Sequence, residues 1–379
     1  MGNELSKLNI DDLPPQLKKH GEDWWAIFNP RVPRKLDIQL MHTLSHTSVV
    51  CCVRFSGDGH YVATGCNRMA QIFEVSSGQV VAQLEDESSD KDGDLYIRSV
   101  CFSPDGALLA TGAEDKCIRV WDITRRAIIA TFTGHEQDIY SLDFSRDGRL
   151  IASGSGDRTV KLWDMTTRKQ SLELQIEEGV TTVALSPDGR LVAAGSLDRS
   201  VRVWDTATGT NIDSLDAPHG SKDQLGGHHD SVYSVSFSPS GNELVSGSLD
   251  KTIKMWELIP PLRGGNGPPK TASRCIRTFE GHSDFVLSVA FSPDDQWVLS
   301  GSKDRGVVFW DRHSGIPQLH LQGHRNSVIS VAPSPNSEMC VFATGSGDSR
   351  ARIWRFVNPL GAIVKANANQ LFSYQPYRG

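Results

Sequence analysis

The sequence predicts an all-β protein that forms one seven-bladed β-propeller, closed by an N-terminal strand. Three observations predict this fold. An aromatic residue followed by a polar or charged one recurs seven times, a glycine-histidine pair precedes four of these dipeptides, and short β-rich segments with tight turns fill the intervals. Successive aromatic residues are 41 to 54 residues apart. A strand-rich repeat of that length is typical of a propeller blade.

The aromatic dipeptides mark the same place in every repeat and lie at Phe73-Glu74, Trp121-Asp122, Trp163-Asp164, Trp204-Asp205, Trp256-Glu257, Trp310-Asp311 and Trp354-Arg355. The histidine pairs that precede them are Ser45-His46, Gly134-His135, Gly227-His228, Gly281-His282 and Gly323-His324. In three repeats the histidine and the tryptophan are 28 residues apart (135 to 163, 228 to 256, 282 to 310). Spacing this regular indicates a true structural repeat.

Each repeat contains several short strands. In the third repeat we expect strands at residues 139–145, 150–153 and 159–163, because apolar and β-branched residues alternate there and an Asp-Gly turn separates the first two. A fourth strand follows the Trp-Asp dipeptide, as at residues 127–132 in the second repeat. No segment has sustained helical periodicity, which excludes a helical solenoid.

The last repeat ends at Trp354 after only three strands, and a spare strand at residues 36–44 precedes the first repeat. We expect this strand to complete the seventh blade, because pairing there removes an open sheet edge. The expected organisation is an N-terminal extension over residues 1–35, the propeller over 36–356 and a C-terminal tail over 357–379. An insertion at residues 258–274 accounts for the longest interval.

A histidine, a hydroxyl residue, an aspartate and a tryptophan recur together in four repeats. One interpretation is a Ser-His-Asp hydrolase. The other is a structural relay of hydrogen bonds from the indole through the hydroxyl and imidazole to the carboxylate. A catalytic triad is needed once, so four copies favour the structural interpretation, with no catalytic residue. The structural sets are His135, Ser153, Asp157, Trp163; His228, Ser246, Asp250, Trp256; His282, Ser300, Asp304, Trp310; and His324, Thr344, Asp348, Trp354.

Composition excludes several other functions. The net charge of −6 argues against general nucleic-acid binding. The seven cysteines are an odd number without a CxxC pair, which indicates reduced intracellular thiols and neither a disulfide framework nor a zinc site. No apolar stretch is long enough to span a membrane, and phosphate-binding and nucleophile motifs are missing. We therefore expect no metal, no cofactor, no membrane contact and no enzymatic activity.

One rim of the propeller is the expected binding surface. It carries the residues at the start of each innermost strand, in positions equivalent to Tyr140, and the turns between the second and third strands. Aromatic, leucine and arginine side chains gathered there resemble an interaction hot spot. The alternative is that they only plug the mouth of the channel. The residues predicted to bind a partner are Cys51, Tyr96, Arg98, Ser99, Glu114, Tyr140, Leu197, Tyr233, Phe285, Leu287, Lys303 and Asn326.

The Trp-Asp and Gly-His repeats resemble the WD40 superfamily. More specifically, the chain looks like the C-terminal propeller of the fungal Tup-family general transcriptional co-repressors. The segments that carry this resemblance include residues 46–53, 94–106, 134–141, 179–184, 301–306, 323–331 and 343–348. In that family a central patch on one rim contacts a DNA-bound repressor. The matching positions here are Cys51, Tyr96, Ser99, Glu114, Leu197, Tyr233, Lys303 and Asn326.

The resemblance implies a non-enzymatic scaffold in the nucleus that DNA-bound repressors recruit and that does not bind DNA sequence itself. It also implies a tetratricopeptide-repeat co-repressor and histones as partners, through an N-terminal coiled coil that forms tetramers. No heptads are visible here. Either the chain is a fragment or the protein lacks that half, and we expect this chain to be monomeric. The alternative function is a WD40 substrate adaptor or signalling scaffold unrelated to transcription.

Overall fold

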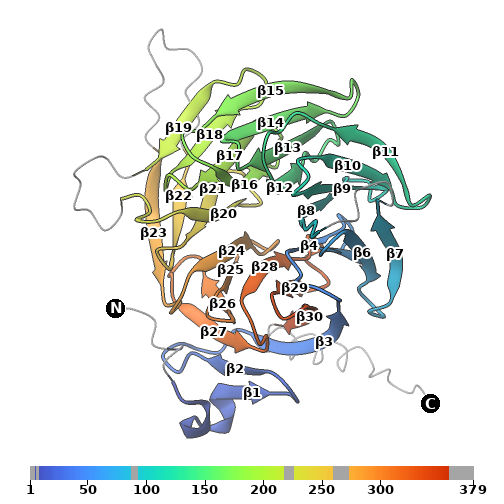
Figure 1. Ribbon diagram of the computed structural model, residues 1–379. Coiled ribbons are helices and arrows are strands. Elements are labelled where there is room, and N and C mark those ends of the chain that lie inside the picture. The colour runs from blue at the N-terminus through green and yellow to red at the C-terminus, as the bar shows by residue number, and fades with distance from the viewer. Residues whose placement is uncertain (1–4, 6–7, 87–92, 217–225, 259–272, 358–379) are drawn as a thin grey trace, which may run out of the picture.

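The computed structural model shows seven antiparallel sheets arranged in chain order around a central channel (Figure 1). It describes residues 5, 8–86, 93–216, 226–258 and 273–357. In each complete repeat the first strand lies at the channel and the fourth lies outermost. The prediction of an all-β, seven-bladed propeller is confirmed.

The first three blades each hold four strands, which from the channel outward are β4 (Cys52–Phe55), β5 (Tyr61–Gly65), β6 (Met69–Glu74) and β7 (Val80–Glu85); β8 (Ile97–Phe102), β9 (Leu108–Ala113), β10 (Ile118–Asp122) and β11 (Ala127–Phe132); and β12 (Ile139–Phe144), β13 (Leu150–Ser155), β14 (Thr159–Asp164) and β15 (Lys169–Gln175). Blades 4 and 5 follow the same order with β16 (Val180–Leu185), β17 (Leu191–Ser196), β18 (Val201–Asp205) and β19 (Asn211–Leu215); and β20 (Val232–Phe237), β21 (Glu243–Ser248), β22 (Thr252–Glu257) and β23 (Arg274–Glu280).

The last two blades each include strands from the N-terminal part of the chain. Blade 6 consists of β24 (Val286–Phe291), β25 (Trp297–Ser302), β26 (Gly306–Asp311) and β27 (Pro317–Gln322), with β2 (Trp25–Phe28) and β1 (Lys18–His20) added outside β27. Blade 7 consists of β28 (Val328–Pro333), β29 (Val341–Ser346), β30 (Arg350–Val357) and β3 (Asp37–Ser45). Two single-turn 3-10 helices, η2 (Ile10–Asp12) and η3 (Pro15–Leu17), precede β1.

Closure of the ring follows the prediction. β3, drawn in blue, pairs antiparallel with the C-terminal β30 from Asp37 opposite Val357 to Ser45 opposite Arg350 (Figure 1). The strand expected at residues 36–44 therefore completes blade 7. β2 pairs with β27, so the segment before β3 also extends blade 6. The N-terminal part of the chain thus links the two blades on either side of the closure.

The hydrophobic core lies between neighbouring blades. Seven buried clusters of the described residues each join two or more sheets; one of them packs Val201 of blade 4 against Val232 of blade 5. Because each blade buries both faces against its neighbours, the strands are apolar on both faces and the ring forms one continuous core. Within the described ranges, no helix is long and apolar enough to cross a membrane. Residues 358–379 of the predicted tail and 259–272 of the predicted insertion lie outside the described part.

Each blade presents two rims. The entry rim carries the loops that lead into the innermost strands and the turns between second and third strands. These two parts lie side by side, because the backbone N–H of Gly156 in the β13–β14 turn donates to Asp138 O, just before β12, at 3.1 Å. The opposite rim carries the remaining turns. All predicted partner-binding residues belong to segments at or next to the entry rim.

Candidate functional site

The four recurring sets form hydrogen-bonded relays inside the blades. In blade 3 the Trp163 indole N–H donates to Ser153 Oγ at 2.8 Å, and the hydroxyl lies 2.6 Å from His135 Nε2. The other imidazole nitrogen, Nδ1, lies 2.8 Å from Asp157 Oδ2. Because the carboxylate only accepts, Nδ1 carries the proton and Nε2 accepts from the hydroxyl. The relay is continuous from indole to carboxylate.

The same geometry recurs in blades 5, 6 and 7. The hydroxyl lies 2.6 to 2.7 Å from the imidazole Nε2 and 2.8 to 3.0 Å from the indole nitrogen in all three blades. In each relay the aspartate also accepts the backbone N–H of the residue after the histidine, at 2.8 to 3.1 Å. The relay therefore fastens the loop at the entry rim to the interior of the blade.

The relays are not placed for catalysis. Ser153, Ser246 and Ser300 are fully buried, and their hydroxyl oxygens accept the indole N–H. A catalytic serine must reach a substrate carbonyl, which these side chains cannot do. Burial opposes ionisation of Asp157, but hydrogen bonds from His135, Thr159 and the Glu136 backbone lower the pKa of this carboxyl well below its usual value.

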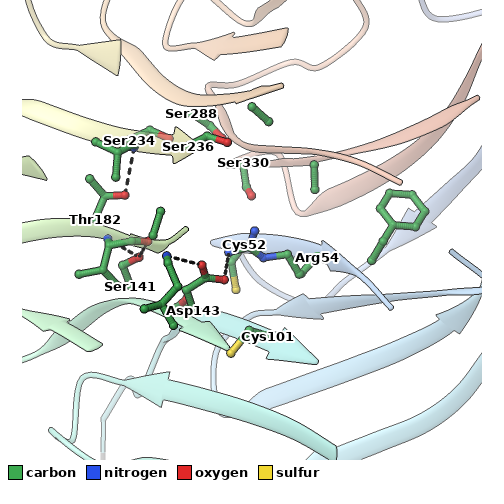
Figure 2. A pocket seen from close by; sticks show the side chains of 18 of the residues that line it. Cys52, Arg54, Cys101, Ser141, Asp143, Thr182, Ser234, Ser236, Ser288 and Ser330 are labelled. Atoms are coloured by element: carbon green, nitrogen blue, oxygen red, sulfur yellow. Dashed lines mark hydrogen bonds and ion pairs between the residues drawn. The ribbon is translucent and has the colours of Figure 1, made fainter. Parts of the chain in front are cut away.

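A second ring of hydrogen bonds joins neighbouring blades around the channel, and Figure 2 labels several of its members. The hydroxyl of one innermost strand accepts a backbone N–H from the next innermost strand, at 2.9 to 3.2 Å. The six acceptors are Ser99, Ser141, Thr182, Ser234, Ser288 and Ser330. Cys52 occupies the seventh position. Sequence reasoning missed this ring, although the recurrence of Ser or Thr at one repeat position was a signal for it.

The channel encloses a cavity of about 840 Å³. Its wall carries an ion pair: Arg54 on β4 and Asp143 on β12 approach to 3.6 Å, and Figure 2 shows the two side chains pointing toward each other. Burial raises the pKa of Asp143, against the effect of Arg54. Asp143 also accepts the Leu185 backbone N–H at 2.8 Å. The pair therefore ties blades 1, 3 and 4 together across the channel.

The twelve predicted partner-binding residues differ widely in exposure. Tyr140, Leu197 and Tyr233 are 41%, 43% and 39% exposed, which is unusual for large apolar side chains and marks an interaction surface. Lys303 and Asn326 are also exposed. The half-buried members are Tyr96, Arg98, Glu114, Phe285 and Leu287, and the buried ones are Cys51 and Ser99. Ser99 belongs to the interblade ring, where its oxygen accepts the Leu142 N–H.

Four of the twelve residues form one cluster across blades 1 and 2. Arg98 forms an ion pair with Glu114, and its guanidinium carbon lies 5.2 Å from the centre of the Tyr96 ring. Glu114 also accepts the Tyr96 backbone N–H at 3.1 Å, and Arg98 Nη1 lies 3.7 Å from Cys51 Sγ. Burial raises the pKa of Cys51 to about 11 despite the nearby guanidinium, so this thiol stays neutral. The cluster holds the Tyr96 ring in place beside the channel mouth.

The remaining members lie on blades 6 and 7. Lys303 places its ammonium 4.7 Å from the centre of the Phe285 ring, a distance at which cation and ring attract each other. Asn326 donates from Nδ2 to Gly347 O at 3.3 Å and accepts the Ser327 N–H at 2.7 Å. Among the described side chains, no group of three or more His, Cys, Asp or Glu is placed to hold a metal ion.

The profile of the family described as WD domain, G-beta repeat matches seven stretches of the chain, at residues 38–74, 87–122, 126–164, 168–205, 221–257, 273–311 and 315–355. These stretches follow the seven blades and cover most of the sequence. The chain belongs to the WD40 family. Its histidine relays and Trp-Asp dipeptides are the repeat positions on which the propeller is built.

This WD40 propeller is similar to several named proteins. Transcriptional repressor rco-1 of Neurospora crassa is 65% identical over 357 residues, which are 93% of this chain and 58% of the relative. General transcriptional corepressor TUP1 of Saccharomyces cerevisiae is 48% identical over 93% of this chain and 57% of the relative. General transcriptional corepressor tupA of Dictyostelium discoideum is 57% identical over 89% and 56%.

The resemblance to Tup-family co-repressors predicted from the sequence is confirmed. The chain spans about half the length of the curated relatives it matches. The names of these relatives describe repressors and co-repressors of transcription, which agrees with the expectation of a non-enzymatic scaffold.

Proposed function

We propose that this propeller is the interaction module of a transcriptional co-repressor and that DNA-bound repressor proteins recruit it through the entry rim. The observation that carries this proposal is the group of exposed Tyr140, Leu197 and Tyr233 side chains at the channel mouth. The relatives named as repressors and co-repressors support the biological setting. Repression of transcription implies action in the nucleus, and we propose that location for this chain.

Rigidity of the rim supports tight binding. The relays fasten the loops of blades 3, 5, 6 and 7, and the interblade hydroxyls fix the innermost strands that begin beneath them. A surface that is ordered before its partner arrives loses less conformational entropy on binding. Aromatic side chains add large contact areas with few rotatable bonds, so Tyr140 and Tyr233 are the expected hot spots.

The longer relatives suggest further partners for a longer form of the protein. We propose that a tetratricopeptide-repeat co-repressor and histones bind outside the propeller, as in the Tup family. The propeller itself would then supply the contact to the DNA-bound repressor. Direct reading of DNA sequence is not part of the proposal, since the chain carries a net charge of −6.

The proposal is tested by a double substitution on the rim, Tyr140→Ala with Tyr233→Ala. The tagged full chain is expressed in fungal cells, and its occupancy at repressed promoters is measured by chromatin immunoprecipitation. Each substitution is expected to cost about 2 kcal/mol of binding free energy, as for hot-spot aromatics, so that the pair lowers occupancy by about tenfold or more.

Tyr61→Ala is the matched control. This tyrosine is 39% exposed, like Tyr233, but begins β5 on the opposite rim. Thermal unfolding of the purified variants shows whether the fold is intact. Unchanged occupancy of the double variant, or an equal loss with Tyr61→Ala, would contradict the assignment of the entry rim.

A further inference from the structure

The seam between blades 3 and 4 differs from every other seam on the entry rim. At each seam, a residue of the turn between the second and third strands of one blade is next to the residue that precedes the innermost strand of the following blade. The seven pairs are Asn67 with Tyr96, Glu114 with Asp138, Gly156 with Gly179, Leu197 with Ser231, Leu249 with Phe285, Lys303 with Ser327, and Gly347 with Val49. Only at the third seam do both residues lack a side chain.

The two glycines are in close contact. A Cβ atom added to Gly179 would lie 3.6 Å from Gly156 Cα and 3.2 Å from Leu197 Cδ1. One added to Gly156 would lie 3.3 Å from Tyr140 Cε2 and 2.9 Å from Gln137 Oε1. The seam is therefore a strip of backbone with an aromatic ring at one end and an aliphatic side chain at the other.

Both flanking side chains are exposed, Tyr140 by 41% and Leu197 by 43%. Gly156 is half-buried, and neither glycine has the left-handed φ that would itself require glycine. Backbone conformation therefore does not explain why side chains are missing at this seam. A strip of bare backbone between two exposed apolar side chains leaves room for one apolar side chain of a partner to contact both.

Acidic residues surround this seam. Glu136 and Asp138 lead into β12, and Glu177 and Glu178 lead into β16; three of them are exposed and Asp138 is half-buried. Within the part of the chain that the structure describes, none of the four carboxylates forms an ion pair. The cations of the adjoining turns are Arg158 and Arg199, so the seam keeps an excess of negative charge. By contrast, the seam between blades 6 and 7 carries Lys303, Arg305 and Arg325.

We propose that the Gly156–Gly179 seam binds a partner segment in which one large apolar residue is flanked by lysine or arginine. The apolar side chain lies on the backbone strip between Tyr140 and Leu197, and the flanking cations face the carboxylates of blades 3 and 4. This inference rests on the proposed function, because it defines the chemistry that the repressor must present. Complementary charge then selects among partners and sets their orientation on the rim.

The probes are three short fluorescein-labelled peptides with the same Gly-Ser ends. Their centres hold leucine flanked by lysines, leucine flanked by glutamates, and alanine flanked by lysines. Binding to the purified full chain is measured by fluorescence anisotropy at low and at physiological salt. The lysine-flanked leucine peptide is expected to bind about tenfold more tightly than either of the others, and this preference should weaken with salt. Equal binding of the three peptides would overturn the proposal.

Gly156→Val fills the strip, and Gly347→Val is its matched control. Gly347 occupies the same turn position in blade 7, where an added Cβ would meet Asn326 atoms at 3.1 Å. Gly156→Val is expected to weaken binding of the lysine-flanked leucine peptide about tenfold, and Gly347→Val to leave it unchanged. Equal effects of the two substitutions would contradict the seam. Thermal unfolding checks that both variants fold.

The charge requirement is tested separately with Glu177→Lys and Glu178→Lys together. This variant is expected to lose the preference for the lysine-flanked leucine peptide over the glutamate-flanked one. Glu338→Lys, which changes an exposed glutamate on the opposite rim, should keep that preference. If the Lys double variant keeps it as well, the charge complementarity is wrong.

Promoter occupancy separates this proposal from the function on which it rests. If Tyr140→Ala with Tyr233→Ala lowers occupancy and Gly156→Val does not, the rim binds repressors and the seam proposal fails. If the peptides bind as expected but no rim variant changes occupancy, the seam stands and the proposed function fails.

Discussion

At the residue scale, the histidines of the relays are structural. His282 donates to Asp304 at 2.8 Å, lies 2.6 Å from Ser300 Oγ and has a buried imidazole. Removing the ring leaves the hydroxyl and the carboxylate without a partner inside the blade. Unsatisfied buried polar groups cost more than the lost hydrogen bonds themselves.

We therefore expect His282→Ala to lower the free energy of unfolding by about 2 kcal/mol. The measurement is denaturant unfolding followed by tryptophan fluorescence, which also reports on Trp310 at the other end of the relay. His229→Ala is the control, because His229 is exposed and contributes only its backbone to Asp250. Similar losses for both variants would argue against a structural relay.

Exposure at the residue scale also limits what the repeat pattern can predict. Cys51, Arg98, Tyr140 and Tyr233 occupy equivalent repeat positions, yet Cys51 is buried and Arg98 is half-buried in an ion pair. Sequence periodicity identified the shared position. Neighbours from the adjoining blade decided which of these side chains stays accessible.

At the element scale, the N-terminal segment contributes more than the closing strand. Asp23, just before β2, forms ion pairs with Arg350 and with the fully buried Arg352 of β30. Trp24 packs edge-on against Trp354, with ring centres 5.6 Å apart. These contacts fix β2 on blade 6 to the last strand of blade 7.

Asp23→Ala is expected to destabilise the protein by about 3 kcal/mol, because the Arg352 charge stays buried without its partner. Equilibrium unfolding in guanidinium chloride measures this loss. Glu22→Ala removes the adjacent, exposed carboxylate and should change stability by less than about 0.5 kcal/mol. A loss for Asp23→Ala no larger than for Glu22→Ala would show that the ion pair does not stabilise the closure.

The interblade ring predicts a stabilising substitution in β4. Cys52 occupies the position at which the other innermost strands place a hydroxyl, so Cys52→Ser supplies an acceptor for the Val100 N–H. We expect a gain of about 1 kcal/mol and a higher Tm. Ser288→Cys makes the reverse change between blades 6 and 7 and should lower stability by a similar amount. A loss of stability in Cys52→Ser would contradict the equivalence of the seven positions.

At the scale of the whole molecule, buried ionisable groups make stability depend on pH in two windows. Burial lowers the pKa of His320 to about 4, although the nearby Asp304 opposes the shift. Between about 6.5 and 4 the unfolded chain binds a proton that the folded chain does not, so stability falls as the pH is lowered. Burial opposes ionisation of Asp348, but His324 lowers its pKa to about 2, and that stabilisation is lost as the pH falls from about 4 to 2.

Unfolding free energies at about pH 7, 5 and 3 test both windows. His320→Gln is expected to flatten the change between pH 7 and 5 and to leave the steep loss below pH 4 in place. Because the pH slope is compared within each variant, an overall change in stability does not affect the test. An unchanged slope between pH 7 and 5 would show that another group titrates there.

The repeat arithmetic also bears on the whole ring. The fold, the closing strand and the four relays were all predictable, because each depends on residue types that recur at fixed spacing, such as His135, Ser153 and Trp163. The pairing of β2 with β27, the Arg54–Asp143 pair across the channel and the Gly156–Gly179 seam were not. Each of these joins residues from different repeats or from the segment before them.

The sequence alone therefore determined the architecture of this protein, since hydrogen bonding along strands and burial of alternating side chains act within one repeat and leave a periodic pattern. Only the tertiary structure decided which rim side chains are exposed and where the rim is bare backbone. That outcome depends on the neighbour that each blade meets when the ring closes. A local pattern does not record that contact.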